Sequence, residues 1–216
     1  MDSWSVSMMR DLKFYVNPYT NLKTIETSGP LVFERGKGIY VYDENGKEYI
    51  EGMSGLWCVA LGFSEERLIK AAEKQLRTLP YYHSFTGKAP TVTLELLERL
   101  MEMAPQPMSK VLLANSGSES NDTAVKVAWY YQNALGRSEK KKIISRRRGY
   151  HGVTIMSGSM TGMDYAHKGF DLPRPLFLHT EAPDYFRESL SGESEDDFTG
   201  RLADSLERLI LKENPE

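Results

Sequence analysis

Small polar and acidic residues around one glycine, at positions 115–121, have the composition of an anion-binding turn. A short apolar run precedes them at 111–114, and apolar or small residues follow at helical spacing. Ser116 and Glu119 have the spacing of a capping box, so a helix is expected to begin there. The first amides of a helix have no partner within it, and the helix dipole adds partial positive charge. The turn therefore suits an anion, most often phosphate.

The same turn has a purely structural interpretation. Capped helices are common in α/β proteins, and a serine and a glutamate at this spacing are sufficient for one. The glycine spacing matches neither of the usual nucleotide loops, because the turn contains no G-x-x-x-x-G-K-[ST] and no G-x-G-x-x-G pattern. A nucleotide-binding module is therefore disfavoured, whereas an anion site and an ordinary helix cap both stay open on the local signal.

A second motif, Gly149-Tyr150-His151-Gly152, follows an apolar segment at 142–145. Residues 116–124 followed by this motif resemble the class III aminotransferases, which use pyridoxal phosphate. The Leu56-Trp57-Cys58 segment is similar to the branch that acts on amines or ω-amino acids with pyruvate as acceptor. The resemblance extends from about Pro18 to the last residue. It implies an α/β fold, that of the fold-type-I pyridoxal-phosphate transferases.

The resemblance assigns the cofactor to these two motifs. It implies that the amides and hydroxyls of Ser116, Gly117 and Ser118 hold the cofactor phosphate, and that Tyr150 stacks on the pyridine ring. Both motifs follow predicted strands, and loops at the carboxyl ends of parallel strands can meet. No metal ligands are predicted.

A substrate pocket is the second site that the resemblance implies. From the residues alone, Trp57 beside glycines is either a core residue or a pocket wall. Tyr19, after a proline turn, is either a surface residue or a pocket aromatic. The resemblance assigns both to the pocket, together with Val153 and with Phe85 from the partner subunit. His83, near Phe85, has no carboxylate partner in sequence and is expected to be packed or solvated rather than a general base.

Two groups that aminotransferase chemistry needs are not assigned in this chain. These are a lysine joined to the cofactor as an imine and a carboxylate on the pyridine nitrogen, which in the resembled family lie in the second half of a longer chain. Lys126 is on the predicted helix and Lys168 is in an irregular stretch, so neither fits. We expect the front part of such an enzyme, without a catalytic residue and inactive alone. The alternative is a truncated non-catalytic fragment or cofactor-binding remnant.

The length and charge allow a sizeable core and imply no acidic polymer as partner. The chain has 216 residues, 40% of them hydrophobic, and a formal net charge of −3, enough for a sizeable core. The single cysteine, Cys58, excludes an internal disulfide and fits a reducing compartment. The basic runs at 140–142 and 146–148 have the composition of a nucleic-acid patch, but they bracket a predicted strand, where solvated basic residues are common.

From these features we expect a cytoplasmic protein with no nucleic-acid partner and no membrane span. The resemblance implies a small-molecule amine and a keto acid as substrates, and a homodimer in the full-length enzyme.

Strand and helix signals alternate after residue 110, which predicts an incomplete, mostly parallel sheet with covering helices. The expected elements are strands at 110–114 and 142–145 with a helix at 117–135 between them. Asn45-Gly46 between apolar runs predicts a hairpin over 38–51 with a type I′ turn. Helices are expected at 65–78, capped by Ser64, and at 91–103, capped by Thr91.

The domain organisation follows from the resemblance. Residues 1–60 are expected to form an N-terminal segment, partly helical within 1–17, and the hairpin of a small domain. Residues 61–216 are expected to form a truncated large domain that binds the cofactor.

Overall fold

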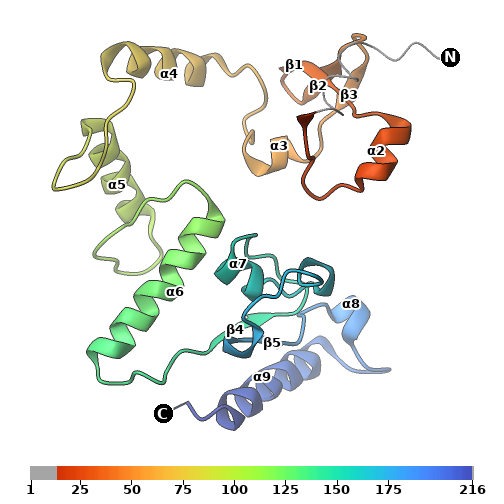
Figure 1. Cartoon of the computed structure of the whole chain (residues 1–216), viewed down its shortest axis with the longest axis vertical. Coiled ribbons are helices and arrows are strands. Elements are labelled where there is room, and N and C mark those ends of the chain that lie inside the picture. The colour runs from red at the N-terminus through yellow and green to blue at the C-terminus, as the bar shows by residue number, and fades with distance from the viewer. Residues whose placement is uncertain (1–13, 216) are drawn as a thin grey trace. The chain divides into compact units, whose positions relative to one another are not determined.

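The computed structural model describes residues 14–215, so most of the segment 1–17 lies outside the described residues. The chain divides into two compact units, one ending at Glu102 and the other beginning at Met103, and each is described by itself (Figure 1). The first unit contains an antiparallel sheet, and the second contains a parallel pair of strands with helices. The expected α/β class is confirmed. The boundary expected after residue 60 stays a prediction.

The sheet of the first unit confirms the hairpin expected over 38–51. Strands β1 (Phe33–Lys37), β2 (Tyr40–Asp43) and β3 (Glu48–Ile50) lie in that order and are antiparallel. Tyr40 lies opposite Ile50, which sets the register of β2 and β3. β1 is a third strand that the sequence analysis did not predict.

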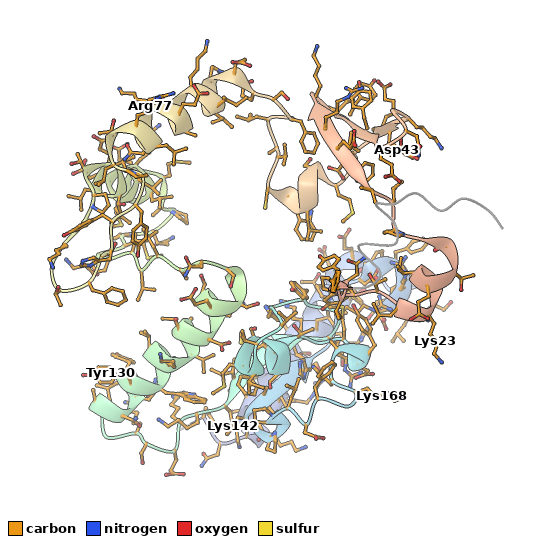
Figure 2. All side chains as sticks on the ribbon, turned by 45° about the horizontal axis from the view of Figure 1, so that its top comes forward. Lys23, Asp43, Arg77, Tyr130, Lys142 and Lys168 are labelled. Atoms are coloured by element: carbon orange, nitrogen blue, oxygen red, sulfur yellow. The ribbon has the colours of Figure 1, made fainter. Side chains whose placement is uncertain are left out.

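The turn between β2 and β3 differs from the expected type I′. The Asp43 carboxylate accepts from the amides of Asn45 and Lys47, each at 2.9 Å, and the Gly46 amide donates to the Asp43 carbonyl (Figure 2 labels Asp43). Of the turn residues, Gly46 alone has a positive φ, +79°. This is a type I turn followed by a left-handed glycine. The correction has a physical cause, because an aspartate side chain that bonds the following amides favours this geometry.

The helices of the first unit are α2 (Leu22–Ser28), α3 (Ser54–Trp57), α4 (Glu66–Thr78) and α5 (Thr91–Met103). The two long ones confirm the helices expected at 65–78 and 91–103. Their expected caps are wrong: Glu65 caps α4 by accepting from the Arg67 amide, and Thr91 is the first residue of α5. Ser64 has φ +61° and donates instead to the carbonyl of Gly36, 28 residues earlier.

The second unit is built around two parallel strands, β4 (Ile143–Arg146) and β5 (Phe177–Thr180), with Ile143 opposite Phe177. α6 (Gly117–Ala134) precedes β4, and α7 (Ile155–Met160) follows it and packs against α6 and both strands (Figure 1). α9 (Glu195–Lys212) packs along β5. The short elements are η1 (Asp164–Ala166), η2 (Arg174–Leu176) and α8 (Tyr185–Glu188).

The strand expected at 110–114 is not formed, whereas the one expected at 142–145 is present as β4. A strand is defined by its ladder with a neighbour. Among residues 14–215 no segment pairs with 110–114, and Leu112 and Leu113 are at least half exposed. The apolar run therefore satisfies the sequence criterion for a strand without the partner that would make it one.

The core of the second unit combines apolar and small polar residues. Val125, Phe177 and Phe198 are nearly inaccessible, and so are Ser157 and Ser159 of α7. The buried Ser159 hydroxyl is satisfied by donating to the Ile155 carbonyl at 2.6 Å. The small side chains of α7 let it pack closely against its neighbours and bring the loop before it to the start of α6.

Candidate functional site

The N-terminus of α6 presents free backbone donors. The Ser116 hydroxyl caps the helix by accepting from the Glu119 amide at 3.2 Å. The expected capping box is only half formed, because the Glu119 carboxylate accepts from the Asn115 amide at 2.8 Å instead of reaching the Ser116 amide. Among the described residues, the amides of Gly117 and Ser118 have no acceptor. Two open amides at the positive end of an 18-residue helix suit an anion.

Three side chains of α6 hold the loop after β4 against this helix terminus. The Ser118 hydroxyl accepts from the Val153 amide at 3.0 Å, and the Asn121 amide group donates to the His151 carbonyl at 2.6 Å. Asp122 accepts from the Thr154 hydroxyl at 2.6 Å and from the amide of Ser157 at 2.9 Å. The two motifs singled out in the sequence therefore meet in one place.

Asn121 and Asp122 make contacts at this candidate site that the sequence reasoning missed. With Ser118 they stand at i, i+3 and i+4, the spacing that places side chains on one helix face. Three polar residues at this spacing, on a helix that also has an apolar face, indicate a polar contact surface.

Gly152 fixes how closely the two motifs approach. Its φ is +130°, and a β-carbon added there would overlap the hydroxyl oxygens of Ser118 and Ser157. Either constraint alone selects glycine. The loop can therefore lie directly on the helix terminus only because position 152 has no side chain.

The loop that carries Tyr150 is fixed by backbone contacts on its other side. The Gly162 amide donates to the Gly149 carbonyl at 2.8 Å, and the Arg148 amide donates to the Gly162 carbonyl at 2.7 Å. The His151 amide donates to the buried Thr161 hydroxyl at 3.0 Å. The Tyr150 side chain itself is half exposed. An accessible aromatic ring on a well-anchored loop can serve as a flat binding face.

Ion pairs on both sides of β4 neutralise part of the basic runs. Arg148 pairs with Asp184 at 2.6 Å and with Glu188 at 3.1 Å, and Lys142 pairs with Glu213 at 2.7 Å. The pKa of the Asp184 carboxyl is held below its ordinary value, first by the hydrogen bond from Arg187 and also by Arg148. These pairs are consistent with basic residues that serve the fold.

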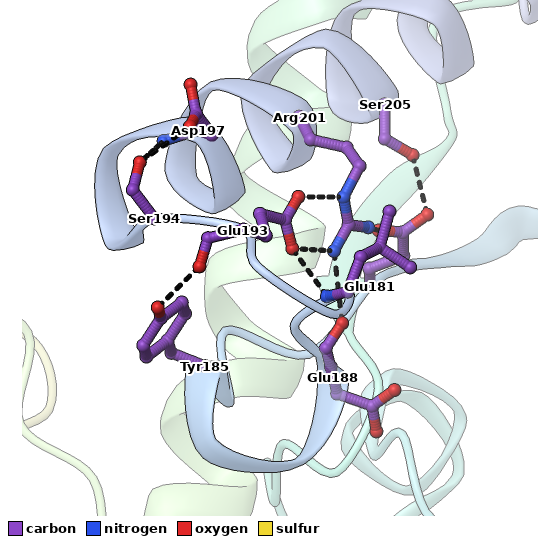
Figure 3. A network of polar contacts seen from close by, with 9 residues as sticks. Glu181, Tyr185, Glu188, Glu193, Ser194, Asp197, Arg201 and Ser205 are labelled. Carbon is purple, nitrogen blue, oxygen red and sulfur yellow. Dashed lines mark hydrogen bonds and ion pairs between the residues drawn. The ribbon is translucent and has the colours of Figure 1, made fainter.

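A second polar network joins α8 and the following loop to α9 (Figure 3). Arg201 donates to both oxygens of Glu193, at 2.7 and 3.0 Å, and to the Glu188 carbonyl at 3.0 Å. Glu181 accepts from the Ser205 hydroxyl at 3.1 Å. The Arg201 hydrogen bonds lower the pKa of the Glu193 carboxyl, and the amide of Leu190 adds to this effect. This arrangement ties three segments together.

The other sequence-predicted site residues lie in the first unit. Tyr19, Trp57 and Phe85 have side chains that are 63%, 74% and 77% exposed. The structure brings Val153 to Ser118, and its grouping with these three aromatics stays a prediction. The ring of His83 stacks on Tyr82, with centroids 4.7 Å apart, which favours the packed alternative over a general base.

Neither a metal-binding cluster nor a membrane-spanning helix is found within residues 14–215. No group of three or more histidine, cysteine, aspartate or glutamate side chains there is placed to hold a metal ion. In the same part of the chain, every helix is too short or too polar to cross a bilayer.

Comparison with known proteins identifies close relatives. The chain is 54% identical to vanillin aminotransferase of Capsicum chinense over 188 aligned residues. The alignment covers 87% of this chain and 41% of that protein. The chain is 53% identical to the mitochondrial gamma-aminobutyrate transaminase 1 of Oryza sativa subsp. japonica, over 87% of this chain and 36% of that protein. The chain therefore spans less than half the length of these curated relatives.

A solved structure gives the same result for the fold. The omega transaminase of Pseudomonas jessenii in complex with PMP has a TM-score of 0.95 and 55% sequence identity, covering 98% of this chain and 47% of that one. The family model described as aminotransferase class-III matches residues 23–216, nearly the whole chain. This protein therefore belongs to the class III aminotransferase family.

Proposed function

We propose that this chain is the cofactor-phosphate-binding part of a pyridoxal-phosphate-dependent aminotransferase. The complete enzyme would move an amino group between an amine or ω-amino acid and a keto acid such as pyruvate. One observation carries the proposal: the two open amides and the Ser118 hydroxyl at the start of α6 lie against the loop that carries Tyr150. Class III aminotransferases use pyridoxal phosphate.

The residues present fit this cofactor. Its phosphate needs several donors, and the Gly117 and Ser118 amides and the hydroxyls of Ser116 and Ser118 supply them. There is room for the phosphate, because a β-carbon at Gly117 would meet nothing within 4 Å. Tyr150 offers an aromatic face for a pyridine ring. When bound, the cofactor supplies an electron-withdrawing ring that stabilises negative charge beside the amine nitrogen.

This chain's own residues would bind and orient the cofactor, and we propose that they do not move the proton. Lys126 is in the middle of α6, about 14 Å along the helix axis from Gly117 at 1.5 Å per residue. Lys168 follows η1 in an irregular stretch (Figure 2). Neither stands in the loop next to the phosphate donors. We therefore propose that the 216-residue chain alone is inactive.

For the substrate site, we propose an apolar pocket with walls from Tyr19, Trp57 and Val153, and from a Phe85 of the partner subunit in a homodimer. Exposed aromatic side chains are suited to contacts made outside their own unit. Such walls favour amine donors with hydrophobic substituents. Relatives are named for vanillin, an aldehyde, and for gamma-aminobutyrate, an amino acid, so the named substrates differ within the family.

The test is binding of pyridoxal phosphate to the purified chain, followed by its absorption spectrum and by competition with inorganic phosphate. Ser118→Ala should weaken binding by about 1–2 kcal/mol, through loss of a hydrogen bond to a charged group. Ser118→Thr keeps the hydroxyl and should bind normally. Ser138→Ala, in an exposed loop, is the matched control.

Competition by phosphate and a specific loss in Ser118→Ala would support the assignment. Equal affinities in the wild type and Ser118→Ala would reject the α6 terminus as the phosphate site. Sequencing the DNA beyond codon 216 distinguishes part of a complete enzyme from the alternative, a non-catalytic remnant. A homologous reading frame there supports the enzyme, and an intact terminator supports the remnant.

A further inference from the structure

The segment before Cys58 has an uncommon backbone. The four residues of α3 all have positive φ: Ser54 at +49°, Gly55 at +59°, Leu56 at +58° and Trp57 at +70°. Consecutive left-handed residues place each β-carbon too close to the next carbonyl, at about 1–2 kcal/mol for each residue other than glycine. Three of the four are not glycine, so the turn needs support from elsewhere.

The carboxylate of Glu51 supplies that support. One of its oxygens accepts from the Met53 amide at 3.0 Å, and the other accepts from the amide of Gly55. The turn is closed by the Trp57 amide, which donates to the Met53 carbonyl at 2.9 Å. Hydrogen bonds to an ionised acceptor are about twice as strong as neutral ones.

The charge of Glu51 has no other use within the described chain. Glu51 forms no ion pair with any described lysine or arginine. Both of its oxygens are directed at amides of this one turn. The turn also requires glycine at position 55, because a β-carbon there would lie 2.6 Å from a methyl group of Val59.

The backbone must fix the direction of the Trp57 side chain. This side chain is 74% exposed, so packing within its own unit does little to hold it. It stands at the end of the left-handed turn, and a right-handed or extended turn would send the side chain in a different direction. The conformation imposed through Glu51 therefore decides where the indole ring projects.

We propose that Glu51 is a positioning residue: its carboxylate holds residues 54–57 in the left-handed turn and thereby sets the place of Trp57 in the substrate pocket. Glu51 does not touch the substrate. The inference deepens the proposed function and rests on it for the role of Trp57, whereas the link between Glu51 and the turn stands on the geometry alone.

The first experiment measures amide hydrogen exchange at Met53 and Gly55 in the 216-residue chain. Glu51→Gln keeps the shape but replaces one acceptor oxygen by a donor group. Exchange should accelerate at least about tenfold, the order expected for a lost charge-assisted hydrogen bond. Glu34→Gln, on β1, is the matched control, because the Glu34 side chain has no hydrogen-bond partner within residues 14–215, and it should leave both rates unchanged. Unchanged rates in Glu51→Gln would overturn the proposal.

A rescue variant separates positioning from general destabilisation. Leu56→Gly removes the strain at φ +58°, because glycine adopts this region freely. Added to Glu51→Gln, it should restore much of the protection at Met53 and Gly55. If the double variant exchanged as fast as the single one, strain relief would not be the role of Glu51.

The second experiment uses the full-length enzyme and a series of amine donors of increasing size. Glu51→Gln should change KM for bulky donors by about tenfold or more relative to small ones, with little change in kcat for the smallest donor and none in cofactor affinity. An accelerated exchange together with an unchanged donor profile would refute the pocket role of Trp57 and leave the Glu51-supported turn intact. The two failures are therefore distinguishable.

Discussion

The side-chain amide of Asn121 donates to the main-chain carbonyl of His151 at 2.6 Å, across 30 residues of sequence. This bond joins the first turn of α6 to the loop that carries Tyr150. It also holds the proposed phosphate donors and the proposed ring-stacking residue at a constant separation.

Asn121→Ala should therefore lower both stability and cofactor affinity. The carbonyl of His151 would lose its partner, at about 1–3 kcal/mol of unfolding free energy. Urea denaturation and pyridoxal phosphate titration measure the two effects. Asn133→Ala, at the opposite end of α6 where it bonds Lys141, is the control for a lost asparagine bond away from the site. A cofactor affinity equal to the wild type in Asn121→Ala would contradict the coupling of the two loops.

The Arg201–Glu193 pair should make the second unit acid-sensitive. The pKa of Glu193 in the folded chain lies below its ordinary value of 4.5, because Arg201 donates to the carboxylate. Its stabilising contribution is therefore complete above about pH 4.5 and is lost as pH falls through the lowered folded-state pKa. Thermal unfolding measured from pH 3 to pH 7 should show this loss at the acid end. Glu193→Gln should flatten that part of the profile, and Arg201→Gln should do the same. An acid limb as steep in both variants as in the wild type would assign the sensitivity to other carboxyls.

Trp57→Gly in the full-length enzyme should shift donor preference toward bulkier amines. The substitution removes the largest side chain of the proposed wall, and the left-handed φ of +70° suits glycine, so the turn itself should persist. Ratios of kcat/KM over a donor size series measure the shift. Phe186→Ala is a control, since this aromatic residue of α8 is 88% exposed and is not assigned to the pocket. The same preference in Trp57→Gly as in the wild type would remove Trp57 from the wall.

The 216-residue chain should not form alanine from pyruvate and an amine donor, even with added pyridoxal phosphate. Positioned acid–base catalysis of a proton transfer contributes about 10²–10⁴-fold, and we assign no residue of this chain to that step. The assay compares alanine formation with that of free cofactor. Turnover well above that background would mean that a lysine such as Lys126 or Lys168 acts after all.

Local signals in the sequence predicted much of the fold. The periodic apolar residues located α4, α5 and α6 to within a residue or two, and the Asn45-Gly46 pair located a hairpin. The failures depended on partners far away in sequence. Residues 110–114 have strand composition, but no segment within residues 14–215 pairs with them, and Ser64 bonds Gly36 instead of capping α4.

The candidate site shows the same difference between features with a local sequence signal and features that depend on distant partners. The turn at Ser116–Ser118 was recognisable as a candidate anion site because glycines and hydroxyls at a helix start can bind anions, whereas the 149–152 motif was identified through the resemblance to the class III aminotransferases. The spacing of Asn121 and Asp122 with Ser118 indicates a polar helix face, but their partners follow from how α6 meets the loop after β4, which the spacing does not give. The left-handed turn at 54–57 opposes the intrinsic preference of Ser54, Leu56 and Trp57, so no propensity could have predicted it.

The two glycines at the proposed phosphate site should behave in opposite ways if every residue there were replaced in turn. Gly117 lies in a helix with open space around its missing β-carbon, so the fold tolerates a side chain there, but a large one would occupy the room proposed for the phosphate. Gly152 has no such freedom, because its φ and its two hydroxyl neighbours each exclude a side chain. Substitution at position 117 should therefore affect the proposed phosphate site while the fold persists, whereas substitution at position 152 should disturb the fold itself.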